Sequence, residues 1–241
     1  MVTKSLINQI QHLKQKKFRQ KKGLFLAEGE KLVEELLEAN FKYIKLFTTE
    51  NSTIFPADFI TKTDMQKLSH LKNASNYLGL FIKPQYVFDL NKISSSILAL
   101  DGISDPGNLG TIIRTCDWYG INDIVCSKDT VDCFNSKVVQ SSMGSISRVK
   151  CHYVDLASFI KTSKMNIYGT SLSGKSIYDL NLKKESIFVF GNESNGISSK
   201  VYEFIDNSIT IPKNNNNLLI DSLNVASSVS IILGERFRQN K

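Results

Sequence analysis

Short apolar runs alternate with amphipathic segments along the whole 241-residue chain. In the first third, apolar runs that are typical of strands lie at residues 24–27, 43–47 and 77–82. Apolar positions at helical spacing between them predict helices at residues 30–39 and from Thr63, where a capping-box pattern begins. An amphipathic helix precedes them and carries Leu6, Ile10 and Leu13 on one face. This order predicts a small β-α-β-α-β domain over residues 1–83.

A polar segment, residues 84–95, follows this domain and is interpreted as a linker. Strand-like runs then recur more regularly, at residues 97–100, 124–126, 149–154, 166–169, 187–191 and 209–212. Helical segments lie between several of these runs, and such alternation predicts a parallel sheet covered on both faces. A last helix is expected from about Leu223, with a continuous apolar face. Residues 96–241 are therefore predicted to form one α/β domain.

Composition narrows the class of protein. Hydrophobic residues make up 41% of the chain, which is ordinary for a globular protein. The sequence has no signal-peptide pattern and no apolar run that could span a bilayer, so we expect a cytoplasmic protein. The four cysteines form no C-x-x-C pair and the three histidines lie far apart, so no metal site is expected.

Positive charge is concentrated near the start of the chain. The formal net charge is +7, and residues 1–27 contain no acidic side chain. Such a run is usually only a solvated surface. Because all its charges are positive and the protein is basic, contact with nucleic-acid phosphates is about as well supported as that simpler interpretation. The candidate residues for contact with phosphates, which are those of RNA if the resemblance described below holds, are Lys14, Lys16, Lys17, Arg19, Lys21 and Lys22.

Ligands of parallel sheets bind at the carboxyl ends of the strands, so polar clusters that follow strands are candidate sites. One such cluster, residues 101–110, leads into a helix that carries Arg114. A simple turn with a surface arginine gives the same pattern, but a planar guanidinium beside a glycine-rich turn also suits phosphate recognition. A second cluster begins at Gly191, where glycine allows close backbone approach, and a third lies at the start of the last helix.

Residues 169–176, with the sequence GTSLSGKS, match the P-loop pattern. A P-loop leads into a sizeable helix, whereas the segment after Ser176 is short and alternates apolar and polar residues. We interpret the match as a coincidence. The alternative, a P-loop nucleotide phosphatase, predicts binding of ATP or GTP that is lost in Lys175→Ala.

Three motifs, taken in order, resemble those of the SpoU/TrmH family of RNA 2′-O-ribose methyltransferases in the SPOUT superfamily. They are residues 105–110 (DPGNLG) with Arg114, residues 191–193 (GNE) with Gly196-Ile197, and Ile211-Pro212 followed by residues 222–225 (SLNV). The resemblance covers residues 97–241. Residues 1–83 are similar in pattern to the ribosomal-protein-like RNA-binding domain often attached in this family. The loop over residues 213–221 is longer than is usual in the family.

The resemblance implies a deep trefoil knot in the second domain, which is an exception to the rule that chains avoid knots. It also implies S-adenosylmethionine as the methyl donor, and a homodimer with the last helix in the interface. The residues implied to line the cofactor pocket are Thr170, Gly191, Ile211 and Leu223.

The resemblance makes Arg114 the catalytic residue. A guanidinium is nearly always protonated and is a poor base, so its expected role is to contact the RNA phosphate and stabilise charge that develops on the 2′-oxygen. Whether Arg114 is itself the base stays open. A sulfonium is a good leaving group, so the reaction needs no metal. The residues implied to position Arg114, the ribose or the cofactor are Asn108, Glu193, Ser222 and Asn224.

The expected function is methyl transfer from S-adenosylmethionine to a ribose 2′-hydroxyl of structured RNA. Ribosomal RNA, 23S above all, is favoured because the first domain resembles ribosomal proteins. A transfer-RNA methyltransferase with the same catalytic set and a non-catalytic RNA-binding knot protein are the alternatives. The sequence names neither the modified nucleotide nor a housekeeping or antibiotic-resistance role.

Overall fold

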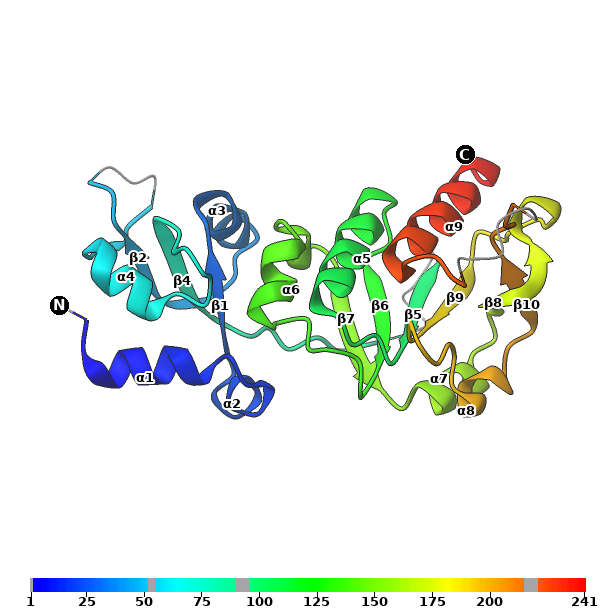
Figure 1. Ribbon diagram of the computed structural model, residues 1–241, viewed down its shortest axis with the longest axis horizontal. Helices are drawn as coiled ribbons and strands as arrows, with labels where there is room; N and C mark the ends of the chain where they lie inside the picture. Colours follow the sequence, from blue (N-terminus) through cyan, green and yellow to red (C-terminus); the bar gives the residue numbers. More distant parts are fainter. Residues whose placement is uncertain (1, 52–54, 90–95, 215–220) are drawn as a thin grey trace. The chain divides into compact units, whose positions relative to one another are not determined.

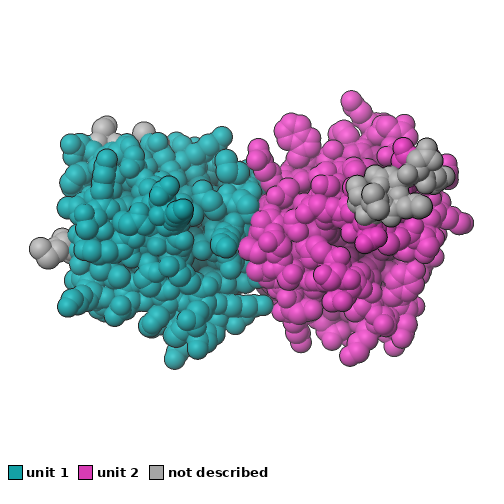
Figure 2. Space-filling model, in the orientation of Figure 1, with its two compact units in different colours: residues 1–85, 132–148 teal, residues 86–131, 149–241 magenta. Residues whose placement is uncertain are grey.

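The computed structural model describes residues 2–51, 55–89, 96–214 and 221–241. The chain divides into two compact units (Figure 2): residues 1–85 with 132–148, and residues 86–131 with 149–241. Residues 132–148 lie between two strands of the second unit in sequence, yet they pack within the first unit. The predicted boundary at residues 84–95 does not account for the packing of residues 132–148 within the first unit.

The first unit contains a four-stranded sheet in the order β1-β4-β2-β3. The strands are β1 (Leu24–Glu28), β2 (Tyr43–Thr48), β3 (Asp58–Phe59) and β4 (Tyr77–Ile82). Its helices are α1 (Lys4–His12), α2 (Lys16–Lys22), α3 (Glu30–Glu38), α4 (Lys62–Leu68) and α6 (Ser136–Ser141), with the short 3-10 helix η2 (Ser145–Ser147). Ile10 and Leu13 are buried in a core that includes residues of α4 and the sheet, so the predicted apolar face of the first helix is confirmed.

Helix α4 begins earlier than predicted. Its N-cap is Thr61, whose hydroxyl accepts a hydrogen bond from the Asp64 N–H at 3.1 Å. The predicted start at Thr63 is wrong because the spacing from Thr61 to Asp64 offers a better cap, with an acidic side chain in the first turn. Leu71, expected on this helix, lies beyond its end.

Arg19 is buried, although it lies within the basic tract. Its Nε donates to Asp132 Oδ2 at 2.7 Å, and Nη1 donates to the carbonyls of Leu13 and Lys14 at 2.7 and 2.9 Å. Only 2% of its surface is exposed. A buried charge is tolerated when it is paired and hydrogen-bonded in this way. Arg19 therefore ties the turn between α1 and α2 to the segment 132–148.

The second unit contains a six-stranded parallel sheet in the order β10-β8-β9-β5-β6-β7. The strands are β5 (Ile97–Asp101), β6 (Asp123–Ser127), β7 (Lys150–Val154), β8 (Asn166–Ser176), β9 (Ser186–Gly191) and β10 (Asn207–Thr210). The predicted parallel sheet is confirmed. All five residues of β5 are buried, as expected for a central strand covered on both faces.

Helices cover both faces of this sheet (Figure 1). They are α5 (Pro106–Trp118), α7 (Leu156–Thr162), α8 (Ser199–Tyr202) and α9 (Val225–Gln239), with the 3-10 helix η3 (Ile177–Asp179). Figure 1 shows α5 and α9 together on one face, and α7 and α8 on the other. The last helix is confirmed, but it begins two residues later than predicted, with Asn224 as its N-cap. In the described part of the chain, the structure contains no helix with the length and apolarity needed to cross a membrane.

The P-loop match lies in a strand. Residues 169–176 form the second part of β8, and a single 3-10 turn follows instead of a long helix. Gly174 lies against the register shift in β10, where an added Cβ would come within 2.5 Å of the Ile209 carbonyl carbon. The interpretation of this match as a coincidence is confirmed, because an extended strand cannot cradle a phosphate in its loop N–H groups.

A buried polar cluster joins α1 to the segment after α4. The Glu28 carboxylate accepts hydrogen bonds from the Ser69 hydroxyl and, at 2.8 Å, from the His70 N–H. The His70 ring lies with Nε2 2.9 Å from the Ile10 carbonyl oxygen, so Nε2 carries the proton and donates it. Within the described structure, His70 Nδ1 is buried without a partner. Desolvation lowers the pKa of His70 to about 4.

We predict that His70 makes folding sensitive to mild acid. Because its pKa is lower in the folded state than the ordinary value near 6.5, the unfolded chain binds its proton first as the pH falls. The free energy of unfolding is then unaffected above pH 6.5 and declines between pH 6.5 and about 4. In His70→Gln, which keeps a donor for Ile10, urea unfolding should show a shallower decline over this range. Equal declines in the two proteins would contradict this assignment.

Candidate active site

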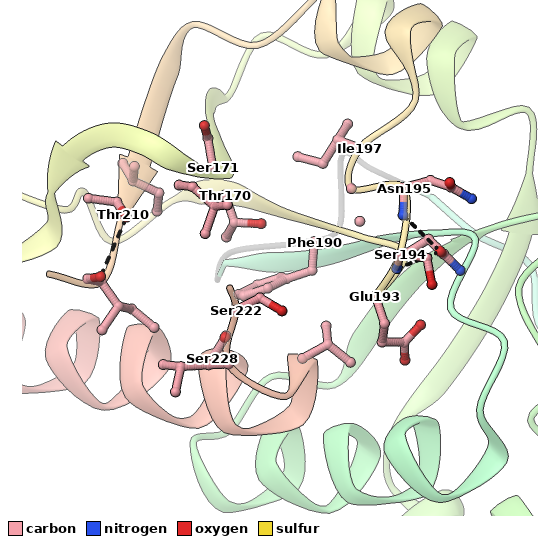
Figure 3. A pocket seen from close by; sticks show the side chains of 18 of the residues that line it. Thr170, Ser171, Phe190, Glu193, Ser194, Asn195, Ile197, Thr210, Ser222 and Ser228 are labelled. Carbon is pink, nitrogen blue, oxygen red and sulfur yellow. Dashed lines mark hydrogen bonds between the residues drawn. The ribbon is translucent and has the colours of Figure 1, made fainter. Parts of the chain in front are cut away.

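A cavity of about 580 Å³ opens at the carboxyl ends of β9 and β10, beside the middle of β8 (Figure 3). Its lining comes from residues 170–172, 190–197, 209–211 and 221–223, together with Tyr202 and three residues of α9. The four residues implied to contact a cofactor all belong to this lining: Thr170, Gly191, Ile211 and Leu223. Of the residues implied in catalysis, Glu193 and Ser222 line it. The cavity lies where the topology of a parallel sheet places ligands.

The loop after β9, residues 191–198, forms one wall of this cavity. Asn192 and Gly196 exchange two backbone hydrogen bonds of 2.9 Å, which close the loop on itself. The Asn192 side chain accepts the N–H groups of Ser194 and Asn195 and donates to the Gly102 carbonyl at 2.8 Å. Asn192 therefore shapes the loop and fastens it to the end of β5.

Asp101 fastens the far end of the same loop. This carboxylate, buried at the end of β5, accepts the Ser198 N–H at 2.7 Å. A charge-assisted hydrogen bond of this kind is stronger than a neutral one. The motifs did not single out Asn192 or Asp101 as functional. The signals available in the sequence were an Asn two residues before a serine and an Asp directly after an apolar strand, since both are typical of side chains that hold loop backbone.

Gly191 is required by close packing of backbone. An added Cβ would meet the Gly196 carbonyl carbon at 2.1 Å and the Ile197 nitrogen at 2.2 Å, a separation that no side chain tolerates. Gly196 is required for a different reason, because its φ of 68° lies in the left-handed region and nothing lies within 4 Å of its Cβ position. The two glycines of the motif thus have separate physical roles.

Asn108 joins the three sequence motifs. Its Nδ2 donates to Glu193 Oε1 at 2.7 Å, and its Oδ1 accepts from Asn224 Nδ2 at 2.9 Å. Asn108 is on α5, Glu193 on the loop after β9, and Asn224 at the start of α9. Residues up to 116 positions apart in sequence therefore form one continuous chain of hydrogen bonds.

The direction of this chain is set by helix capping. Asn224 Oδ1 accepts the N–H groups of Ala226 and Ser227 at 2.9 and 3.2 Å, so its Nδ2 faces Asn108. Asn108 must then accept with Oδ1 and donate with Nδ2, which suits the Glu193 carboxylate. Asn108 itself is placed by the Asp105 cap, whose Oδ1 accepts the Asn108 N–H at 2.7 Å. Pro106 follows at the first helical position, where its fixed φ favours the helix.

The charge of the cavity favours a cationic ligand. Among the described residues that line it, Glu193 and Asp221 are acidic, and there is no Lys, Arg or His. Phe190, Ile209 and Ile232 supply apolar surface next to these carboxylates. A molecule with an apolar body and a positive centre complements this lining.

Arg114 lies outside both the cavity lining and the Asn108 hydrogen-bond chain. It is exposed on α5, and within the described structure it makes no hydrogen bond or ion pair. Six residues after Asn108 correspond to about 600° of helical rotation, so Arg114 points roughly 120° away from Asn108. The single chain therefore does not bring Arg114 to the other implied catalytic residues.

The basic tract is exposed at five of its six candidate positions: Lys14, Lys16, Lys17, Lys21 and Lys22. Four of these lysines belong to α2. Arg19 is the correction to the predicted set, because its guanidinium is buried against Asp132 and cannot reach a phosphate. In the part of the chain that the structure describes, no group of three His, Cys, Asp or Glu side chains is placed to hold a metal ion.

Comparison with known proteins also separates the two ends of the chain, with a boundary between residues 79 and 95. The model of the SpoU rRNA Methylase family matches residues 95–234, and that of an MRM3-like substrate binding domain matches residues 4–79. The chain is 31% identical to the 23S rRNA (guanosine(2553)-2′-O)-methyltransferase RlmP of Bacillus subtilis (strain 168), over 90% of each protein.

Solved structures share the whole architecture. An RNA methyltransferase of the TrmH family from Porphyromonas gingivalis superposes with a TM-score of 0.88 at 31% identity, over 99% of each chain. An AdoMet-bound rRNA methyltransferase from Sinorhizobium meliloti superposes with a TM-score of 0.86 at 26% identity, over 99% of this chain and 96% of that one.

The parallel sheet and its cavity give an α/β protein with a ligand site, and the family model and the relatives make it an RNA methyltransferase. The chain belongs to the SpoU rRNA Methylase family, as the SpoU/TrmH resemblance of its three motifs indicated.

We predict that the two glycines of the loop respond differently to substitution. Gly191→Ala forces a Cβ into the backbone of Gly196 and should lower the free energy of unfolding by roughly 1–3 kcal/mol, as overpacking does. Gly196→Asn introduces a residue that tolerates positive φ, so it should lower the free energy of unfolding by less than about 1 kcal/mol. Urea unfolding and amide exchange over residues 191–198 measure both. An equal effect of the two substitutions would contradict the role assigned to Gly191.

Proposed function

We propose that this protein transfers a methyl group from S-adenosylmethionine to a ribose 2′-hydroxyl of ribosomal RNA, with 23S RNA as the favoured substrate. The observation that carries the proposal is the hydrogen-bond chain Asn224–Asn108–Glu193, which ends on a carboxylate in the lining of the cavity. The relatives support the same reaction, since RlmP of Bacillus subtilis is named as a 23S rRNA guanosine 2′-O-methyltransferase.

S-adenosylmethionine fits the cavity in size, polarity and charge. Its sulfonium supplies an activated methyl group, and a cationic molecule suits a lining whose charged members are Glu193 and Asp221. Thr170, Gly191, Ile211 and Leu223 would hold it, largely by shape and backbone groups. The Sinorhizobium meliloti structure, which is AdoMet-bound, supports this assignment.

The residues of the chain position the nucleophile. Glu193 is oriented by the Asn108 amide, so its carboxylate presents a fixed acceptor to a ribose hydroxyl at the rim of the cavity. Asn108 is in turn held by Asn224, which is locked by capping α9. Ser222, also in the lining, offers a further hydroxyl beside the cofactor. Because these groups are held in place by one another, the site is preorganised to stabilise the transition state.

The role proposed for Arg114 is to contact the RNA phosphate and stabilise charge on the 2′-oxygen, and this role fits a homodimer. Trp118, one helical turn after Arg114, is 83% exposed, and Phe237 of α9 is 43% exposed. The two helices pack together through a Thr115–Ser230 contact of 3.3 Å. A second copy that covers this α5–α9 face would bury Trp118 and bring Arg114 to the site of its partner.

Two further features belong to the proposal. A deep trefoil knot is one of them: β10 lies at one edge of the sheet, and α9, which follows it in sequence, packs against α5. We also propose that the protein acts in the cytoplasm.

Transfer RNA remains the alternative substrate, since Arg114, Asn108, Glu193 and Asn224 serve either RNA. The presence of this complete set favours an enzyme over a non-catalytic RNA-binding protein.

We predict that the Asn224 amide, and not only its capping oxygen, is needed for turnover. Asn224→Asp keeps an acceptor for the Ala226 and Ser227 N–H groups but cannot donate to Asn108. Transfer of labelled methyl to unmodified ribosomal RNA should fall about 100-fold, as expected for a misplaced catalytic group. Cofactor affinity by calorimetry and the melting temperature should stay close to the wild-type values.

The matched control is Asn135→Asp, at the N-cap of α6, where the side chain serves as a cap for Lys137 in the first unit. It should leave methyl transfer within about twofold. Wild-type turnover in Asn224→Asp would contradict the positioning role. Label on bulk transfer RNA alone would keep the mechanism and replace the proposed substrate.

A further inference from the structure

A stacked pair of rings lies at the corner between α1 and α2. His12 is the last residue of α1, and its imidazole stacks on the Phe18 ring of α2. The two ring centroids are 4.7 Å apart, and the ring planes differ by 14°. The chain turns between the two helices (Figure 1), and this turn brings the two side chains face to face.

The His12 ring is the outer member of this pair. His12 is exposed, whereas Phe18 is half-buried. Because Phe18 covers one face of the imidazole, the exposure of His12 leaves the other face to solvent. Within the described residues, the His12 ring makes no hydrogen bond or ion pair. Packing accounts for the position of Phe18, but an exposed ring without a polar partner adds little to the stability of the fold.

Arg19 fixes the corner that carries the pair. Its Nη1 donates to the carbonyls of Leu13 and Lys14, the two residues directly after His12, at 2.7 and 2.9 Å. Its Nε donates to Asp132 Oδ2 at 2.7 Å. The turn between the two rings is therefore ordered before any ligand binds, which reduces the entropy that binding must overcome.

Positive charge surrounds the pair. The Lys17 ammonium lies 5.1 Å from the centroid of the Phe18 ring. Lys14 is also exposed, two residues after His12, and residues 1–27 contain no acidic side chain. Proteins bind single-stranded nucleic acid with this combination, in which the cations contact phosphates and an exposed ring stacks on a base.

The ligand that complements this surface is RNA with an unpaired base. Lysines alone bind duplex and single-stranded RNA through their phosphates. In a duplex, neighbouring base pairs cover the faces of each base, so a ring on the protein surface has no base face to stack on. An open His12 ring therefore adds a preference for unpaired RNA. Stacking uses no hydrogen-bonding edge, so the surface is expected to accept any of the four bases.

We propose that the stacked pair His12–Phe18 is a platform on which the first unit binds one unpaired base of its RNA substrate, while the neighbouring lysines contact the phosphates beside that base. The proposal rests on the proposed function only in taking RNA as the ligand. It adds a base contact to a tract whose lysines suit contact with phosphates, and it makes the unpaired state of the RNA the property that this surface recognises.

The test uses the full-length protein and two fluorescein-labelled RNAs, an oligouridine of about 12 nucleotides and an RNA duplex of the same length. Fluorescence anisotropy at fixed salt measures both affinities. His12→Ala should weaken binding of the oligouridine about tenfold, because one stack is lost, and should leave binding of the duplex within about twofold. His12→Tyr keeps a ring that can stack, so it should bind the oligouridine within about twofold of the wild-type protein.

The matched control is Gln20→Ala. Gln20 is an uncharged, exposed residue of α2, and its position two residues after Phe18 places it about 200° around the helix from that ring. This substitution should change neither affinity. Far-UV circular dichroism of each variant ensures that a loss of binding is not a loss of fold.

Equal weakening of both RNAs in His12→Ala would overturn the platform, as would an unchanged affinity of that variant for oligouridine. Binding of oligouridine by His12→Tyr as weak as that by His12→Ala would also overturn it. Methyl transfer to ribosomal RNA by the wild-type protein is measured in parallel. Transfer together with normal oligouridine binding in His12→Ala rejects the platform and leaves the proposed function intact. The expected loss of binding without any transfer supports the platform and rejects that function.

Discussion

The side-chain amide of Asn108 is the interaction on which the site depends. An amide has a fixed donor and a fixed acceptor, and here each has one partner: Glu193 accepts from Nδ2, and Asn224 donates to Oδ1. Because Asn224 is oriented by the first backbone N–H groups of α9, the direction of every hydrogen bond in the chain follows from the position of one helix. The Glu193 carboxylate is thereby held in one orientation at the cavity.

The parallel sheet explains why three distant motifs meet. Each motif follows a strand whose carboxyl end lies at the same edge, so the sheet topology brings α5, the loop after β9 and the start of α9 together. Asn192 and Asp101 then fasten the loop to the end of β5. Rigid backbone surrounds a cavity whose charged groups are acidic, while the exposed positive charge of the basic tract lies in the other unit. We propose that these two surfaces, which lie in separate units, bind a cationic cofactor and a polyanionic RNA respectively.

Periodicity and turn chemistry predicted the longer strands of both sheets, because buried parallel strands and amphipathic helices leave strong patterns in sequence. They missed the two-residue strand β3 and the extension of β8 to Ser176. The motifs located the cavity lining, and the cap residues Asp105 and Asn224 set the helix starts that shape it. Two features depend on tertiary contacts that no local pattern records. Arg19 reads as one more cation of a basic tract, and only its distant partner Asp132 makes it a buried structural residue. The packing of residues 132–148 within the first unit depends on the same contact. Arg114 is a different matter: it is exposed on α5 outside the cavity lining, and the catalytic role proposed for it rests on the proposed homodimer.

The central claim is that this site methylates a ribose oxygen and not a base. The most direct measurement is to label unmodified ribosomal RNA with methyl-tritiated S-adenosylmethionine and the purified protein, and then to hydrolyse the RNA completely in alkali. A methyl group on the 2′-oxygen blocks cleavage at the next phosphate, so the label is predicted in alkali-resistant dinucleotides, and Arg114→Ala should abolish it. Label recovered in mononucleotides would place the methyl group on a base and contradict the account.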